Sequence, residues 1–484
     1  MREPTIHLRR KSLSKMTDES GWKDAYGATI ERVKAQDEGT SGLGMAALMW
    51  LSHAERPLRA DELCHALAVE LGSKVFDAGN TPSISTLVGC CLGLITMDNE
   101  ASTLRLIHPT LKEYLSTRAD IFSRPHSTIA EICLTYLNSE QVQSIPADHS
   151  LTIRDTPFLE YCSLYWGVHA KRDLSDDARL LVLRLLKDYD SHISGKLLLE
   201  QGKYPDRRGC DRSSSSDPDS DIGFPFSGMH CASFFGITGV VHDLIQMGRP
   251  MNGGDTRGSS PLAWAARNGH EGVVELLLTW GQAGLGPSDY AGQVPLLYAV
   301  FGGHERVVEV LLRHLWIEPD VANGLGRTPL SYAAQGGHEG VVKILLEQPR
   351  VNQDQHDLSG NTPLSFAARG GYDRVVKILL GRADINADRP NLDGQTPLAY
   401  GASGGYEEVV KVLLGRNDVK PDKPDNDGRT PLICAASGGH AGVVKILLQR
   451  EEVNPSKQDN EGQTPLMLAT GLGFKEVITL LQYY

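Results

Sequence analysis

The chain has 484 residues, of which 40% are hydrophobic and 22% charged, and its formal net charge is −12 at pH 7. The acidic balance argues against a protein that binds phosphates or anionic lipid headgroups, because such surfaces need an excess of Lys and Arg. No stretch approaches the roughly 20 apolar residues that span a bilayer. We therefore expect neither a nucleic-acid partner nor membrane insertion.

The N-terminus, residues 1–15, is basic but lacks the apolar run of a signal peptide. Eight cysteines are scattered without a Cys-x-x-Cys pair, and most stand in apolar helical stretches. Reduced core thiols are therefore expected instead of disulfides or metal ligands. These features predict a cytoplasmic protein, with the nucleus as the alternative location.

Residues 43–122 have the pattern of a winged-helix domain. Amphipathic runs predict helices at 45–53, 61–71, 84–91 and 109–117. Within "GLITMDNEASTLRLI", two short apolar strands flank the turn at 98–100 and predict a β-hairpin wing. The candidate recognition helix, "PSISTLVGCCLG", has no basic side chain to present to DNA bases, so this domain is expected to dock on protein.

Residues 123–204 continue with helical patterns and predict a helical extension of the first domain. The segment "CDRSSSSDPDSD" is rich in Ser and Asp and poor in apolar residues. Such a composition predicts a flexible linker, which we place at residues 205–223. A second domain is expected over residues 224–484.

An internal repeat fills this second domain. A Pro-Leu pair recurs at a constant step of 34 residues, with Gly three positions before and eight positions after each proline. Apolar pairs such as Val375-Val376 and Leu379-Leu380 recur in the same register. A fixed period of this length marks a stacked-repeat architecture. The prolines of the seven regular units are Pro261, Pro295, Pro329, Pro363, Pro397, Pro431 and Pro465.

Local physics explains one unit. Thr362 can cap a helix that begins at Pro363, where a missing N–H is harmless. Gly370 and Gly371 end that helix, and a second helix follows with an apolar face too large to bury within one unit. Stacking of neighbours buries it, so the units form a solenoid. A degenerate eighth copy, at 229–245, is expected to cap or join the stack.

This unit, with its hairpin turn, its Thr-Pro-Leu and its Gly-His or Gly-Tyr corner, resembles the ankyrin repeat. The resemblance implies a non-enzymatic protein that binds a protein partner at its hairpin tips and first-helix ends. Family repeats often carry His two residues after the proline; this chain does not, so the hydrogen bond that braces the hairpin is expected to be lost. Carried onto this sequence, the contact positions are Arg257, Tyr290, Phe301, Leu325, Arg327, Gln335, Arg369, Gln395 and Arg429. The alternative is that the near-identical units from Gln395 onward are spacers.

Phrases in the first half, "WLSHAERPLRADELCHALAVELG", "CCLGLITMD", "LRLIHPTLKEYL" and "TPFLEYCSLYWGVHA", resemble the winged-helix and helical region of fungal NACHT-ankyrin receptors. That region is shared with proteins named for a GPI inositol-deacylase winged helix. "DAYGATIERVKAQ" is similar to the end of the NACHT module, so residues 1–42 are interpreted as its remnant. The resemblance implies a mainly α fold: a winged-helix and helical domain, then an ankyrin α-solenoid of one degenerate and seven regular repeats.

The motifs of the related enzymes are missing. The Gly-Lys pairs Gly195-Lys196 and Gly202-Lys203 lack the rest of a P-loop, and a Gly-x-Ser-x-Gly nucleophile elbow is absent. No catalysis, cofactor or small-molecule substrate is therefore expected. The leading hypothesis is a protein-binding scaffold. The alternative is a truncated fragment or accessory subunit of a NACHT NTPase or lipase-type enzyme whose catalytic module lies elsewhere.

Three repeated columns are expected to be structural. The His-Glu pairs, such as His338-Glu339, lack the second histidine of a zinc helix and are predicted to brace the turn between helices. An aromatic column is predicted to pack between neighbouring helices. An aspartate column is predicted to be solvated, since its members lie too far apart to share a metal ion. These columns are Trp264, Tyr298, Tyr332, Phe366 and Tyr400, and Asp320, Asp354, Asp388 and Asp422.

Overall fold

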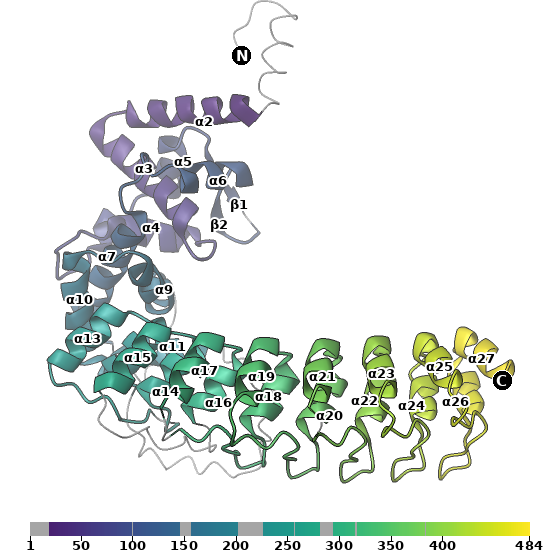
Figure 1. Ribbon diagram of the computed structural model, residues 1–484. Helices are drawn as coiled ribbons and strands as arrows, with labels where there is room; N and C mark the ends of the chain where they lie inside the picture. Colours follow the sequence, from purple (N-terminus) through teal and green to yellow (C-terminus); the bar gives the residue numbers. More distant parts are fainter. Residues whose placement is uncertain are drawn as a thin grey trace, which may run out of the picture. The chain divides into compact units, whose positions relative to one another are not determined.

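The computed structural model describes residues 19–98, 100–145, 156–201, 226–255, 257–280, 294–314, 317–382 and 384–484. The chain divides into two compact units, residues 1–249 and residues 250–484. Both are built mainly from helices, which confirms the predicted fold class (Figure 1). The predicted linker at 205–223 and the predicted contact residue Tyr290 lie outside the described residues.

The beginning of the first unit has the predicted winged-helix order. Strands β1 and β2 pair antiparallel, with Ile95 opposite Leu106. Arg59, just before the second winged-helix helix, forms an isolated bridge to Thr103, so a third short segment joins the wing. The elements are α2 (Glu19–Lys34), α3 (Glu38–His53), α4 (Ala60–Ala68), η1 (Ala78–Asn80), α5 (Ile84–Cys90), β1 (Ile95–Asp98), β2 (Thr103–Leu106) and α6 (Pro109–Thr117). Helix α4 ends before the predicted residue 71, because the backbone becomes extended at Val69.

Further helices complete the first unit. Helix α7 packs against α9 and α10, and it brings Cys133 and Leu134 into a core where both are fully buried. These elements are α7 (Pro125–Leu137), α8 (Glu140–Gln143), α9 (Leu159–Arg172), α10 (Asp176–Leu186), η2 (Tyr189–Ser191), α11 (Ile193–Gln201), α12 (Gly228–Phe235) and α13 (Thr238–Gln246).

The degenerate repeat, α12 and α13, packs on this helical extension. A Cβ atom on Gly167 of α9 would lie 2.1 Å from the ring of Phe235, so only glycine allows this approach. Arg179 of α10 forms an ion pair with Asp243 of α13, with 2.6 Å between Nη2 and Oδ1. The degenerate copy is therefore anchored to the helices that precede it in the chain.

The second unit is a row of helix pairs whose loops follow one edge (Figure 1). The apolar side chains Val375, Val376 and Leu379 of one second helix are fully buried, as the stacking argument requires. The helices are α14 (Pro261–Arg267), α15 (Glu271–Trp280), α16 (Pro295–Phe301), α17 (Glu305–Leu312), α18 (Pro329–Gly336), α19 (Glu339–Leu346), α20 (Pro363–Gly370), α21 (Asp373–Leu380), α22 (Pro397–Ser403), α23 (Glu407–Leu414), α24 (Pro431–Ser437), α25 (Ala441–Leu448), α26 (Pro465–Leu472) and α27 (Lys475–Gln482).

The first helix of each pair begins where the sequence predicts. Thr362 Oγ1 accepts a hydrogen bond from the Ser365 N–H at 3.2 Å, and Pro363 occupies the first helical position. Ser365 stands where family repeats often have His, and its hydroxyl lies 3.1 Å from Thr362 Oγ1. A contact between two hydroxyl groups therefore forms at the place of the missing histidine.

The glycine after the first helix is required twice over. Gly371 has a φ of +74°, which side-chain-bearing residues rarely adopt. A Cβ atom there would also lie 2.6 Å from the ring of Tyr406, which belongs to the next repeat. The same packing places His304, His338, Tyr372, His440 and Phe474 against the preceding repeat's glycine.

The histidines of this corner link two repeats. His338 Nε2 donates to the Phe301 carbonyl at 3.1 Å, and His440 Nε2 donates to the Ser403 carbonyl at 2.9 Å. Each acceptor ends the first helix of the preceding repeat. The predicted brace within one turn is therefore, in the structure, a brace between neighbouring repeats.

The prediction of a solvated aspartate column is wrong. Asp388 is only 8% exposed and pairs with Lys423 of the next repeat, with 2.9 Å between Oδ2 and Nζ. Asp422 pairs with Lys457 at 2.9 Å, and Asp354 with Arg389 at 3.4 Å. The cation follows the aspartate by one repeat and reaches back across the loop. These carboxylates therefore connect repeats.

Removing one cation from these ion pairs between repeats should destabilise the stack. Lys423→Met is expected to lower the free energy of unfolding by about 1–2 kcal/mol, because the Asp388 carboxylate is left partly buried and unpaired. Lys420→Met is the matched control, since Lys420 is exposed in the same loop, and its effect should stay within about 0.5 kcal/mol. Urea unfolding followed by circular dichroism measures both. Equal free energies of unfolding for the two variants would contradict a stabilising role of the ion pair between Asp388 and Lys423.

Candidate functional site

In the part of the second unit that the structure describes, each hairpin is closed by a side chain that caps its own turn. Asp357 Oδ1 accepts hydrogen bonds from the N–H groups of Ser359 at 2.9 Å and Asn361 at 2.8 Å. The same pattern recurs at Asp255, Asn323, Asn391, Asp425 and Asp459. Because this cap fixes the turn, the residues between its ends form the tip.

The capping residue is matched to the aromatic residue of its own repeat. Trp264 has an N–H donor, and it donates to Asp255 Oδ2 at 2.9 Å. Tyr332 and Tyr400 present hydroxyl acceptors instead, and they face the amide donors of Asn323 at 2.7 Å and Asn391 at 2.9 Å.

The aromatic column therefore has a structural role, as predicted. Trp264 and Phe366 are each 4% exposed. The Tyr400 hydroxyl also donates to Asn361 Oδ1 of the preceding repeat at 3.0 Å. Burial raises the pKa of Tyr400, so its hydroxyl stays neutral and keeps these hydrogen bonds at physiological pH.

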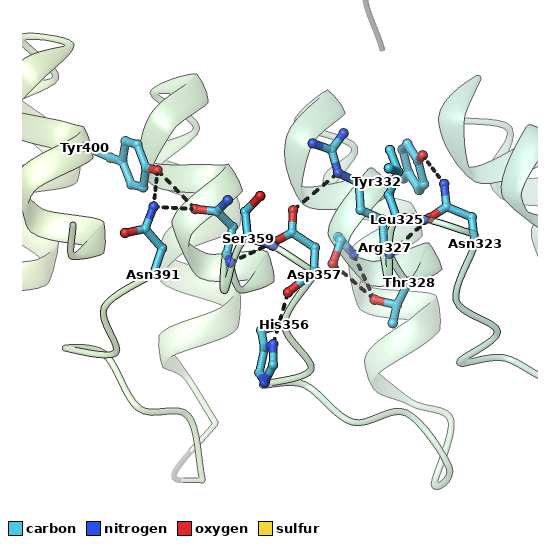
Figure 2. A network of polar contacts seen from close by, with 12 residues as sticks. Asn323, Leu325, Arg327, Thr328, Tyr332, His356, Asp357, Ser359, Asn391 and Tyr400 are labelled. Atoms are coloured by element: carbon cyan, nitrogen blue, oxygen red, sulfur yellow. Dashed lines mark hydrogen bonds and ion pairs between the residues drawn. The ribbon is translucent and has the colours of Figure 1, made fainter. Parts of the chain in front are cut away.

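Phe366 has no polar atom, and a different contact replaces the missing hydrogen bond. Arg327 from the preceding hairpin pairs with Asp357, with 3.4 Å between Nε and Oδ2 (Figure 2). Its guanidinium also lies 4.9 Å from the centre of the Phe366 ring. The predicted contact residue Arg327 is thus held between two repeats, and its side chain is 22% exposed.

Successive hairpins are joined through their backbones. The Leu358 N–H donates to the Leu325 carbonyl at 3.0 Å, and the Leu392 N–H donates to the Ser359 carbonyl at 3.0 Å. Three neighbouring tips therefore keep a fixed register.

These three tips expose leucine side chains. Leu325 is 42% exposed, Leu358 70% and Leu392 71%. We call these three residues the leucine ridge. Leu325 was predicted from the sequence as a contact residue, whereas Leu358 and Leu392 were not. Each of these two leucines stands directly after a capping residue, and this position in the sequence could have identified them as tip residues.

The predicted residues at the ends of the first helices are also exposed. Phe301 at the end of α16 is 41% exposed, and its ring lies 6.1 Å from that of Tyr332. Gln335 near the end of α18 and Arg369 near the end of α20 are exposed, and the Arg369 guanidinium lies 5.7 Å from the Tyr400 ring centre. This row offers an aromatic, an amide and a guanidinium group in three successive repeats.

Later repeats present a different surface. Their first-helix ends carry Ser403 and Ser437, and their tips carry Asn426 and Asn460. Each of these asparagines donates from Nδ2 to the carbonyl of the preceding tip residue, at 2.8 and 2.9 Å. Among the described hairpins, the exposed apolar side chains of the tips therefore belong to those between residues 323 and 395.

The other predicted contact residues are dispersed. Arg257 and Arg429 are exposed in hairpins that do not belong to the leucine ridge. Gln395 is half-buried, and its N–H is used to close the hairpin through Asn391 Oδ1 at 2.8 Å. The structure thus brings some of the predicted residues together with the ridge and separates others from it.

Two family models match the chain. The model of ankyrin repeats matches residues 228–323, 314–389 and 398–484. The model of the GPI inositol-deacylase winged helix domain matches residues 32–124. A comparison with curated proteins gives no match. Among the described residues, no helix has the length and apolar character needed to cross a membrane. Because the ankyrin matches cover more than half of its residues, the chain belongs to the ankyrin-repeat family.

Proposed function

We propose that the chain is a non-enzymatic scaffold that binds a protein partner through the leucine ridge and the exposed ends of α16, α18 and α20. The observation that carries this proposal is the exposure of Leu325, Leu358 and Leu392 on three adjacent tips. Exposed apolar side chains gathered in this way mark interaction sites in soluble proteins. Phe301 and Arg369 add the aromatic and guanidinium groups that are frequent at the centres of interfaces.

The charge along the tips suggests which partner fits. The tip position two residues after the capping residue is acidic in three successive hairpins. These residues are Asp393, Asp427 and Glu461. The whole chain is also acidic, with a formal net charge of −12. A partner with an apolar segment flanked by Lys or Arg would complement both surfaces.

For the first unit we propose a docking or regulatory role, as in the fungal NACHT-type receptors that the sequence resembles. The match to the winged helix domain of GPI inositol-deacylase supports the relationship. We also propose a cytoplasmic location and keep the predicted domain division. Its parts are residues 1–42, 43–122, 123–204, 205–223 and 224–484.

The same match favours a second candidate function, in which the chain is an accessory subunit of a separate NTPase or lipase-type enzyme. The two candidates differ in what co-purifies with the chain. Stable recovery of a NACHT NTPase or lipase with the full chain would favour the accessory role. Recovery of a partner without such a catalytic module favours the scaffold.

The scaffold proposal is tested by affinity capture with the full chain from cells that express it. Leu358→Asp/Leu392→Asp should reduce recovery of the partner about tenfold or more, because the centre of the interface becomes charged. Ser403→Asp/Ser437→Asp is the matched control, with the same two charges at exposed first-helix ends outside the proposed interface. Equal recovery by the ridge variant and the wild type would refute the proposal.

A further inference from the structure

A cluster of two histidines and a carboxylate lies in the first unit. Glu55 follows α3, His126 stands in the first turn of α7, and His169 belongs to α9. One ligand atom from each of the three lies within 4.8 Å of the other two. His169 is fully buried, and the other two are half-buried. Neither family model covers all three residues.

The imidazoles of His126 and His169 contact each other through their Nδ1 atoms. His126 Nδ1 and His169 Nδ1 are 2.8 Å apart, so one must donate and the other accept. Burial lowers the pKa of both rings, that of His169 to about 3, and Arg172 lowers both further. Both rings are therefore neutral near pH 7, as metal-bound imidazoles are.

The surroundings hold the ligand groups in place. The hydroxyl of Tyr161 lies 2.9 Å from His169 Nε2 and accepts from the Glu55 N–H at 3.2 Å. If His169 Nε2 carries the proton and donates it to Tyr161, the Nδ1 lone pair of His169 is available. Glu55 also pairs with Arg172, which orients its carboxylate and offsets the charge of the guanidinium. Outer hydrogen bonds of this kind orient metal ligands in proteins.

We propose that Glu55, His126 and His169 bind one divalent transition-metal ion, with Zn²⁺ as the best match to two imidazoles and a carboxylate. The ion would take the place of the hydrogen bond between the two Nδ1 atoms. Tetrahedral ligands at about 2.0–2.1 Å from zinc are about 3.3 Å apart, so these nitrogens must separate by about half an ångström. Water would complete the coordination.

Titration of the metal-free full chain tests this site. Zn²⁺ is added in competition with a chromophoric chelator, and Co²⁺ binding is followed by its visible absorption. One equivalent should bind, with a Co²⁺ spectrum that lacks thiolate charge-transfer bands. His126→Ala and Glu55→Gln should each raise Kd at least about tenfold. His356→Ala, which removes an exposed histidine in the ankyrin repeats, is the control and should leave Kd unchanged.

The outcomes are distinct. If the wild type binds less than one equivalent, or both variants bind like the wild type, the site does not exist and the histidines form only a hydrogen-bonded pair. Thiolate bands in the Co²⁺ spectrum would equally overturn the assignment. If His126→Ala fails to fold, Glu55→Gln decides, because it keeps the size of the side chain. Partner capture by the leucine ridge is a separate property and does not depend on this result.

Discussion

Replacing Arg56 with alanine is expected to lower the free energy of unfolding of the first unit by about 3–5 kcal/mol. The Glu62 side chain is 0% exposed, and Arg56 makes two hydrogen bonds to it, at 2.6 and 2.7 Å. The hydrogen bonds to Glu62 raise the pKa of Arg56, so its guanidinium stays charged. Without Arg56, a buried carboxylate loses its main partner. Arg59 keeps a backbone hydrogen bond to Glu62 at 2.8 Å and an ion pair with its carboxylate at 3.7 Å, which favours the lower end of the range.

The double variant Arg56→Met/Glu62→Met is the control for this prediction. It removes both charges together, so the cost of an unpaired buried charge disappears. It also removes the Glu62 contact that caps α4, which costs about 1 kcal/mol. Urea unfolding, followed by the fluorescence of the buried Trp50 and Trp166, compares the variants. If Arg56→Ala is as stable as Arg56→Met/Glu62→Met, an unpaired Glu62 carboxylate does not destabilise the first unit, and the prediction is wrong.

Replacing Gly371 with alanine is expected to lower the free energy of unfolding of the repeats by about 2–3 kcal/mol. Its φ of +74° costs an alanine about 1–2 kcal/mol, and the new Cβ atom must push the Tyr406 ring away. Gly473 provides a matched control in the last repeat. Its φ is +78°, and nothing lies within 4 Å of its Cβ position. Gly473→Ala should therefore cost only the backbone strain.

The difference between the two glycine variants measures the ring contact. A double-mutant cycle of Gly371→Ala with Tyr406→Ala isolates it further, since the ring is then absent. Chemical unfolding followed by circular dichroism gives the four stabilities. If Gly371→Ala and Gly473→Ala lower the free energy of unfolding equally, the packing of the Tyr406 ring on Gly371 does not exclude a side chain at residue 371.

Much of the repeat architecture could be predicted from the sequence because it follows from local physics. Thr362 and Pro363 begin a helix and Gly371 ends it, whatever lies around them. The ion pair between Asp388 and Lys423 could not be predicted in this way. It depends on how two loops of neighbouring repeats align, and neither residue shows this by its type.

The candidate site was predicted only in part for the same reason. The family pattern indicated Phe301 and Leu325, which are exposed, but it also indicated Arg327, which packs on Phe366. Arg327 is used internally because Phe366 cannot bond the capping Asp357 as Trp or Tyr does in other repeats. That Arg327 takes over the contact with Asp357 is seen only in the structure, where the capping residue and the aromatic residue of one repeat lie beside the hairpin of the preceding one.

The winged-helix order of the first unit was predicted from its helical runs and its hairpin. The packing of the degenerate repeat was not, because it depends on the contact of Phe235 with Gly167. The cluster of Glu55, His126 and His169 had no sequence signal either, since its members lie far apart in the chain and form no known motif. Tertiary packing alone brings these groups together.

Hydrogen–deuterium exchange of the full chain, with and without its captured partner, tests the central claim most directly. The account predicts slower exchange on binding in the hairpins of the leucine ridge, residues 323–327, 357–361 and 391–395, and little change in the hairpin at 459–463. Protection confined to residues 19–201, with the ridge hairpins unchanged, would show that the partner binds elsewhere and would contradict the account.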